Sequence, residues 1–234
     1  PCIIHQLDLR VGLANKLCAS IVRVGTVSWK ELRHDKLLKR YHPIFTGTPV
    51  RRSFRHVWSK EEAVSKISFQ LNQHIPTILI MGGGTGSHGI NNLAWNNVSE
   101  LTKRANVIHI TGKEKSRNAT LQSGDIIRNG YYYSFDLIQD ADTLAAIYAV
   151  ADLIVCRAGM GTLVELAAIG KPALVIPLES SNAQQIENAE YFAKRAAIEI
   201  FPEGEKEHFF TKIIDLLNNK EGRMSLAKNI KLLD

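Results

Sequence analysis

The most informative part of the sequence is a short apolar run that leads directly into a glycine-rich turn: Thr77-Ile78-Leu79-Ile80-Met81-Gly82-Gly83-Gly84-Thr85-Gly86-Ser87-His88-Gly89. The run is apolar throughout, which is typical of a parallel strand that is buried on both faces. Four similar runs follow at helix-length intervals, at residues 106–110, 152–156, 173–177 and 197–201. The pattern predicts βαβ units with right-handed crossovers, and therefore an α/β protein with a doubly wound parallel sheet.

The composition is that of a globular protein. The chain has 234 residues, of which 45% are hydrophobic and 22% are charged, so it can form one sizeable core or two modest ones. It contains no run of about 18 uncharged apolar residues, the length a membrane-spanning helix needs. The formal net charge of +6 suits an anionic ligand, an anionic lipid surface or nucleic acid. The three widely spaced cysteines (Cys2, Cys18 and Cys156) predict buried small side chains in a reducing compartment.

The first 51 residues resemble the end of a separate α/β unit. They contain a strand-like segment at 2–5, a helical pattern near 12–20 and a second apolar stretch at 21–29. Gly47 and Pro49 interrupt the pattern, and we place a hinge there. We therefore expect two domains, 1–51 and 52–234, the second ending in two amphipathic helices within 205–234. The chain begins at Pro1 and enters a strand at once, so we expect an upstream part of the first domain.

Two glycine-rich turns follow predicted strands. The first contains Gly84, Gly86 and Gly89 in GxGxxG spacing, and the second spans residues 157–162. Ligands of doubly wound sheets bind outside the carboxyl ends of the strands. Glycines let phosphate oxygens approach backbone amides, and the helix that follows adds a favourable dipole. The turns therefore predict a site for a phosphate-bearing ligand, although a tight strand-to-helix connection alone also explains the first turn.

Glu165 and a later polar cluster each have two interpretations. The segment from Thr162 to Glu165 fits a capping box, in which Glu165 reaches back to the start of its helix. Alternatively, the Glu165 carboxylate accepts both ribose hydroxyls of a nucleotide. Gln184 and Asn188 lie four residues apart on one helix face, where their amides suit sugar hydroxyls. An ordinary polar helix start explains the same cluster.

A dinucleotide oxidoreductase is the first competing class. That fold places an acidic residue about 20 positions after the glycines, at the next strand end. Here the strand at 106–110 ends in Thr111-Gly112-Lys113, and Lys113, Lys115 and Arg117 favour a 2′-phosphate, so NADP stays open. Two glycine turns in one domain with a late polar cluster fit a different ligand better. The segment Asp140-Ala141-Asp142 spells DxD, a metal–nucleotide motif known from one enzyme fold, but it precedes a helix and is expected to cap it.

The order of these motifs resembles the GT-B glycosyltransferases of peptidoglycan synthesis, which add N-acetylglucosamine to lipid I and make lipid II. The similarity covers almost the whole chain. It is carried by His5-Gln6-Leu7-Asp8, residues 12–16, 46–51, 81–86, 148–152, 156–159 and 165–168, and Gln184-Gln185 with Asn188-Ala189. The resemblance implies a GT-B architecture, in which a Rossmann-like donor domain follows the end of a second Rossmann-like domain.

The resemblance also implies roles for individual residues. Glu165 would hold the donor ribose, and Arg51 would stand near the diphosphate. Gln184 and Gln185 would bind the sugar hydroxyls, and Ala141 would present backbone groups to uracil. The turn residues that would meet the diphosphate and sugar are Gly84, Thr85, Gly86, Met160, Gly161 and Thr162.

Three departures from the family pattern leave the donor sugar open. Gly84 stands where the family usually has Ser, so Thr85 or Ser87 is the candidate replacement hydroxyl. Asp8 stands where Asn is common near the donor sugar, and Asp140-Ala141 replaces a more apolar pair beside uracil. The catalytic base and the acceptor site are expected upstream of Pro1, and we nominate no residue for them.

The implied activity is an inverting hexosyl transfer in peptidoglycan synthesis, and so in cell shape and division. N-acetylglucosamine would move from UDP-N-acetylglucosamine to the C4 hydroxyl of N-acetylmuramyl-diphospho-undecaprenol, with no cofactor and no metal ion. The implied partners are the UDP-sugar, the lipid-linked acceptor and the anionic inner face of the cell membrane. Scattered tryptophans without a basic array argue against nucleic acid. The alternatives are a related GT-B enzyme with another UDP-sugar or acceptor, an NADP-dependent oxidoreductase and a non-catalytic nucleotide-sugar-binding module.

Overall fold

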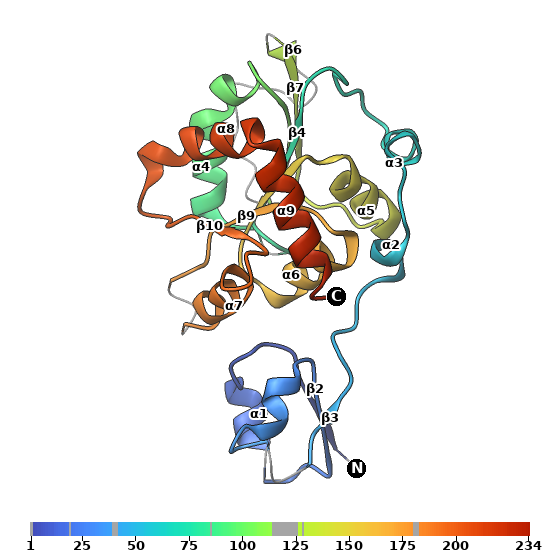
Figure 1. Ribbon diagram of the computed structural model, residues 1–234, viewed down its shortest axis with the longest axis vertical. Helices are drawn as coiled ribbons and strands as arrows, with labels where there is room; N and C mark the ends of the chain where they lie inside the picture. Colours follow the sequence, from blue (N-terminus) through green and yellow to red (C-terminus); the bar gives the residue numbers. More distant parts are fainter. Residues whose placement is uncertain are drawn as a thin grey trace.

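The computed structural model describes residues 2–18, 20–38, 42–84, 86–113, 126–127, 129–179 and 183–234. Its described strands form two sheets, a small one near the N-terminus and a large one (Figure 1). The small sheet is parallel in the order β1-β2-β3. Its elements are β1 (Ile3–Gln6), α1 (Leu13–Cys18), β2 (Val24–Val27), the 3-10 helix η1 (Lys30–His34) and β3 (Ile44–Phe45).

The large sheet has seven strands in the order β10-β9-β8-β4-β5-β7-β6. All of its described pairs are parallel except β6 with β7. The strands are β4 (Thr77–Met81), β5 (Asn106–Ile110), β6 (Ile126–Ile127), β7 (Gly130–Phe135), β8 (Leu153–Cys156), β9 (Ala173–Val175) and β10 (Glu199–Ile200). The predicted doubly wound α/β sheet is confirmed, and β6 and β7 are additional strands that the sequence pattern did not predict.

Helices cover both faces of the large sheet. Ile78 and Ile80 of β4 lie in one core with α4 (His88–Leu101) and α8 (Phe209–Asn218). Leu79 and Met81 lie in the other core, with α5 (Ala141–Val150) and α6 (Met160–Ile169). Because successive side chains of a strand point to opposite faces, burial on both sides requires an unbroken apolar run.

The C-terminal region forms two helices, as predicted. A 3-10 helix, η3 (Lys206–His208), leads into α8, and α9 (Lys220–Lys231) follows it after Asn219. The Asn219 side chain accepts a hydrogen bond from the Gly222 amide at 2.8 Å, which caps α9 and fixes the break between the two helices.

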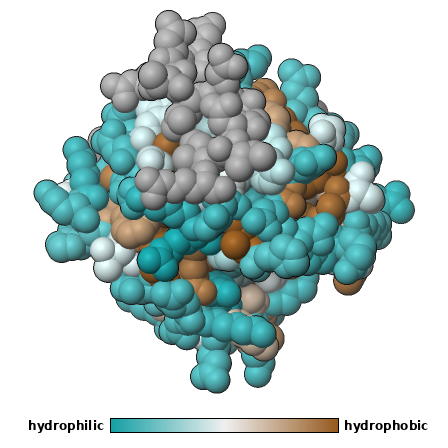
Figure 2. Space-filling model, turned by 90° about the horizontal axis from the view of Figure 1, so that it is seen from above, coloured by the Kyte–Doolittle hydropathy of each residue, from teal (hydrophilic) through white to brown (hydrophobic). Residues whose placement is uncertain are grey.

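The end of the molecule farthest from the small sheet has a mostly hydrophilic surface with separate hydrophobic areas (Figure 2).

A segment without helix or strand, residues 46–51, joins the small sheet to α2 (Arg52–Arg55) and α3 (Lys60–Lys66). The small sheet meets the large one through α7 (Gln184–Ala193), which lies on the facing side in Figure 1. The Trp29 ring packs against the Tyr191 ring at 5.0 Å, and the Tyr191 hydroxyl donates to Glu31 at 3.0 Å. The domain boundary at residue 51 stays a prediction.

The cysteines correct one expectation. Cys156 is buried, and burial raises the pKa of its thiol to about 12. Cys2 is exposed and Cys18 is half-buried, so the prediction of three buried cysteines is wrong for these two, which lie in the small-sheet region.

Of the helices in the described residues, none has the length and apolar character needed to cross a bilayer.

Candidate functional site

The two glycine turns lie side by side. β4 and β8 pair in parallel with Met81 opposite Cys156, so the turns leave neighbouring strand ends. Gly86 has a φ of +69°, and a Cβ there would lie 2.2 Å from the Thr111 carbonyl oxygen. Only glycine fits this position, and it packs the first turn against the end of β5. The helices after the turns, α4 and α6, therefore begin at the same edge of the sheet.

A pocket of about 270 Å³ lies where the two turns meet. One side is made by the turn residues and by the charged pair that Arg51 forms with Glu165. The other side is apolar and comes from the ends of β4 and β5, the residues after β7, and α5. The lining residues are Arg51, Met81, Gly83, Gly84, Ile110, Leu137, Ile138, Leu144, Gly161, Thr162 and Glu165. Backbone amides, one carboxylate and an apolar wall suit a ligand with a phosphate, hydroxyls and a flat ring.

Glu165 is the central charged group of this pocket. Arg51 donates to its Oε1 from Nε at 3.0 Å and from Nη2 at 2.5 Å, and the Tyr148 hydroxyl donates to Oε2 at 3.4 Å. The Glu165 side chain is 15% exposed and that of Arg51 is 44% exposed. Burial raises the pKa of Glu165, and the hydrogen bonds and charge of Arg51 oppose that rise. Arg51 therefore stabilises the ionised carboxylate.

The capping-box interpretation of Glu165 is wrong. Helix α6 begins at Met160 with Gly159 as its N-cap, and no side chain caps it. Thr162 therefore lies inside the first turn of the helix, and the Glu165 carboxylate bonds to Arg51 and Tyr148 instead. The helix ends at Gly170, which takes the left-handed conformation at a φ of +71° that glycine favours at this position.

Arg157 is a buried residue that sequence reasoning did not single out. It is 7% exposed and donates to Ser87 Oγ at 2.7 Å, to both carboxylate oxygens of Glu203 at 2.9 Å and to the Ile176 carbonyl at 3.1 Å. Ser87 is the N-cap of α4, so this guanidinium connects the second turn to the end of the first. Ser87 Oγ accepts from Arg157 and from the Ile90 amide, and a hydroxyl that accepts can still donate its hydrogen, so the role of Ser87 as a replacement phosphate ligand stays a prediction.

Residues 77–232 match the model of the glycosyltransferase family 28 C-terminal domain. The chain belongs to this family. A Clostridium tetani relative is 32% identical over 98% of this chain, and a Streptococcus pneumoniae relative is 31% identical over 100% of it. Both relatives are named UDP-N-acetylglucosamine–N-acetylmuramyl-(pentapeptide) pyrophosphoryl-undecaprenol N-acetylglucosamine transferase. The chain spans 62% and 63% of their lengths.

Solved structures agree with the fold of this family 28 chain. Acinetobacter baumannii MurG is 21% identical, with a TM-score of 0.69 over 99% of this chain and 63% of that chain. A glycosyltransferase from Rickettsia africae is 12% identical, with a TM-score of 0.61 over 99% of this chain and 64% of that chain. The predicted GT-B-type architecture is confirmed, and membership of family 28 does not favour the alternative of an NADP-dependent oxidoreductase.

Five of the predicted donor-binding residues line one pocket. They are Arg51, Gly84, Gly161, Thr162 and Glu165. Two other predicted residues of the same turns do not line this pocket. Gly86 packs against the end of β5, and the Met160 side chain is buried in the core. Thr85 lies outside the described residues.

Ala141 is the first residue of α5 and does not precede that helix as expected. The predicted cap is confirmed: Asp140 Oδ2 accepts from the Thr143 amide at 2.8 Å. In the described part of the chain, no group of three or more His, Cys, Asp or Glu side chains is arranged to hold a metal ion.

Asp8, Gln184 and Gln185 lie outside this pocket, around the start of α7. Gln185 Oε1 accepts from the Leu178 amide at 3.0 Å. Asp8 Oδ1 accepts from Asn188 Nδ2 at 3.0 Å, across the seam between the small sheet and α7. The same Asn188 nitrogen donates to the carbonyl of Ala158 at 3.1 Å. This second group therefore contacts the second glycine turn through Ala158, outside the pocket lining.

Proposed function

We propose that the chain is the donor-binding part of an inverting hexosyltransferase. It would move N-acetylglucosamine from UDP-N-acetylglucosamine to the C4 hydroxyl of N-acetylmuramyl-diphospho-undecaprenol, in peptidoglycan synthesis. The single observation that carries the proposal is the pocket in which two glycine turns converge beside the Glu165 carboxylate. Membership of family 28 and the names of the curated relatives support it.

Each part of the donor has a counterpart in the site. Uracil would lie against the apolar wall near Ala141, and its ribose hydroxyls would donate to Glu165. The amides of Gly84, Met160 and Gly161, with the Thr162 hydroxyl, would face the diphosphate, whereas the Gly86 amide bonds to the Gly83 carbonyl at 3.0 Å. The hexose would extend from the diphosphate towards the small sheet. There it would face Gln184, Gln185 and the Asp8–Asn188 pair.

Arg51 would change partner when the donor binds. In this structure it pairs with Glu165, the same carboxylate that the ribose would use. Ribose hydroxyls that bond to Glu165 would compete with the guanidinium, which would then turn to the negative diphosphate. Since Arg51 ends the connecting segment 46–51, this exchange would link donor binding to the junction between the two sheets.

The transfer would break the bond from the sugar C1 to the β-phosphate oxygen and form a bond from C1 to the acceptor O4. The UDP that leaves would be stabilised by the helix N-termini, the turn amides and Arg51. Inversion also needs a base for the acceptor hydroxyl proton, and we nominate none. The described residues supply donor binding and leaving-group stabilisation.

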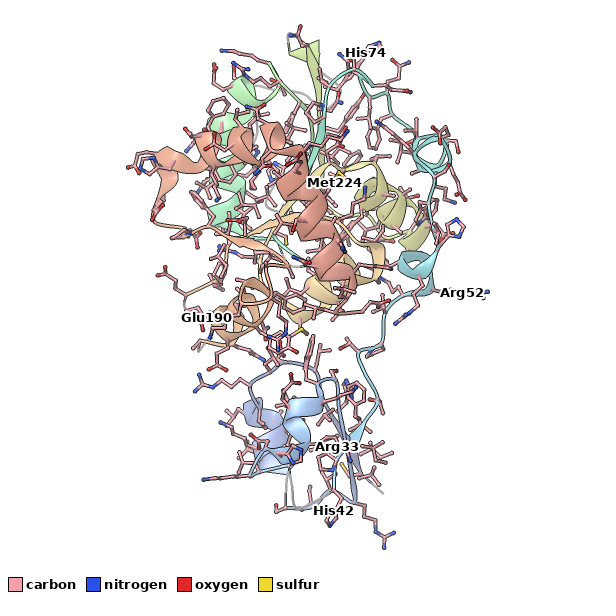
Figure 3. The ribbon with its side chains drawn as sticks, viewed as in Figure 1. Arg33, His42, Arg52, His74, Glu190 and Met224 are labelled. Carbon is pink, nitrogen blue, oxygen red and sulfur yellow. The ribbon has the colours of Figure 1, made fainter. Side chains whose placement is uncertain are left out.

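The charge distribution favours an anionic partner for the small-sheet domain. Residues 1–51 contain nine Lys or Arg and three Asp or Glu, which accounts for the whole formal net charge of +6. The basic residues are Arg10, Lys16, Arg23, Lys30, Arg33, Lys36, Lys39, Arg40 and Arg51. Arg33 and His42 lie on the small domain, apart from the large sheet (Figure 3). The inner face of the cell membrane, which would hold the lipid-linked acceptor, fits this charge.

Titration calorimetry tests the proposed donor. We expect UDP and UDP-N-acetylglucosamine to bind, the sugar nucleotide more tightly, and NADPH not to bind. No UDP binding at millimolar ligand would refute the proposal. The departures at Asp8, Gly84 and Asp140 keep a second candidate, a family 28 enzyme that uses another UDP-hexose. Tighter binding of UDP-glucose or UDP-galactose than of UDP-N-acetylglucosamine would favour that candidate.

A further inference from the structure

The Asn188 side chain has an unusual hydrogen-bonding state. It is 1% exposed, and its Nδ2 donates to Asp8 Oδ1 at 3.0 Å and to the Ala158 carbonyl at 3.1 Å. Its Oδ1 is buried and has no hydrogen-bond partner among the described residues. A buried polar atom without a partner costs free energy unless another group satisfies it.

The orientation of this amide is fixed by its two partners. A carboxamide has two N–H donors and one carbonyl oxygen, whereas an ionised carboxylate and a backbone carbonyl only accept. Asp8 and Ala158 therefore use both donors of Asn188 and leave its oxygen unpaired. Rotating the amide by half a turn would bring Oδ1 against two other oxygens, which is unfavourable. The Ala158 carbonyl already favours this orientation, and the Asp8 carboxylate enforces it a second time. An asparagine at position 8 would not add this second restraint, because its amide can either donate or accept.

We infer that Asp8 is a positioning residue that holds Asn188 as a pure hydrogen-bond acceptor for a hydroxyl of the donor hexose. The inference rests on the proposed function, which brings the hexose to this seam. Asn188 lies one helical turn after Gln184 on α7 and donates to the Ala158 carbonyl in the second turn. Asp8 reaches it from the small sheet, so the orientation favoured by Ala158 is reinforced when the two domains meet at this seam.

The test compares binding of UDP with that of UDP-N-acetylglucosamine, because UDP lacks the hexose. The quantity measured is the ratio of the UDP Kd to the UDP-N-acetylglucosamine Kd for each variant. Asp8→Ala should lower this ratio about 3- to 10-fold, as expected for one weakened neutral hydrogen bond, and leave the UDP Kd within twofold. Asp8→Asn, whose amide oxygen can still accept, should recover part of the loss.

A matched control lies next to Asn188 on the same helix. Glu187 forms another contact across the seam, with Arg10 at 3.1 Å, and both side chains are nearly half exposed. Glu187→Gln weakens that contact without touching the amide, and it should leave the ratio unchanged. An equal fall of the ratio in Glu187→Gln would show that general docking of the domains, and not amide orientation, is responsible.

Other outcomes separate the two proposals. If the ratio of the UDP Kd to the UDP-N-acetylglucosamine Kd is the same in Asp8→Ala as in the wild-type protein, the Asp8 inference is overturned and the proposed function stays intact. The same holds if Asp8→Ala weakens UDP and the sugar nucleotide equally, since a merely structural role predicts that result. Wild-type protein that binds neither ligand would overturn both proposals.

Discussion

Replacing Glu165 by alanine should weaken UDP binding by about 0.5–3 kcal/mol, or roughly 2- to 150-fold in Kd. Two opposing effects set this range. The variant loses hydrogen bonds from the ribose to a charged group, worth about 1.5–3 kcal/mol. The wild-type protein, however, must break its Arg51–Glu165 pair to bind, and such a partly exposed pair contributes about 0–1 kcal/mol. The loss therefore exceeds the offset.

The assay is titration calorimetry with UDP and with 2′,3′-dideoxy-UDP, which lacks both ribose hydroxyls. Wild-type protein should prefer UDP, whereas Glu165→Ala should bind the two ligands equally. Glu199→Ala is a matched control, because Glu199 pairs with Lys212 at 2.9 Å on β10 and does not line the pocket. It should retain the wild-type preference.

One result would refute the reasoning about Glu165. If Glu165→Ala binds UDP as tightly as the wild-type protein and only its melting temperature falls, the carboxylate serves the fold through Arg51 and Tyr148. The ribose would then have to be held elsewhere. Equal losses of UDP and dideoxy-UDP affinity would lead to the same conclusion, because they show that the hydroxyls are not the groups recognised.

Three further perturbations test how the site is built, each by urea denaturation. Gly86→Ala should destabilise the fold by about 1–3 kcal/mol because of its positive φ and the backbone carbonyl beside it, whereas Gly84→Ala, in open space, should change stability by less than about 1 kcal/mol. An equal effect of the two changes would contradict this account of the turn. Arg157→Met should cost about 2–4 kcal/mol because it leaves the Glu203 carboxylate, 26% exposed, without its partner, and adding Glu203→Leu should recover part of that loss. No recovery would show that the pair itself is unimportant. Burial lowers the pKa of His109 to about 4, so its imidazole is neutral when folded, while the unfolded chain takes up a proton below about pH 6.5. The unfolding free energy should therefore fall by about 2 kcal/mol between pH 7 and pH 5, and His109→Gln should remove most of that fall; an unchanged pH dependence in the variant would exclude His109 as its source.

The central strands could be predicted from the sequence because burial on both faces leaves a one-dimensional signal. The bounds expected for β4 and β5 agree with the structure, since all five residues of each strand are buried. β7 escaped prediction for the opposite reason. Its residues alternate between buried and half-buried positions, and it is rich in tyrosine, so it has no continuous apolar run. Its partner β6 has only two residues, too few for any periodicity.

The site could be predicted only as far as local patterns reach. Glycines after strands mark the turns, and Glu165 stands at a fixed distance from the second turn. The partners of Glu165 could not be predicted from such local patterns, because Arg51 lies 114 residues away in the sequence. A capping box is a local rule, and it fitted the letters from Thr162 to Glu165 while the helix began earlier, at Met160. The contacts of Arg157 with Glu203 and of Asn188 with Asp8 also join distant segments, so no spacing rule could reveal them.

These long-range contacts place the two ends of the donor under different control. In the proposed binding mode, the large sheet forms almost all of the nucleotide end, and among the described residues Arg51, at the end of the connecting segment, reaches it from the small-sheet side. At the hexose end, the small sheet supplies Asp8, which bonds across the seam to Asn188. Movement between the two sheets would therefore leave the uridine pocket largely intact and would disrupt the hexose contacts first. It follows that UDP should bind even when the seam is open, whereas discrimination between hexoses requires the seam to be closed.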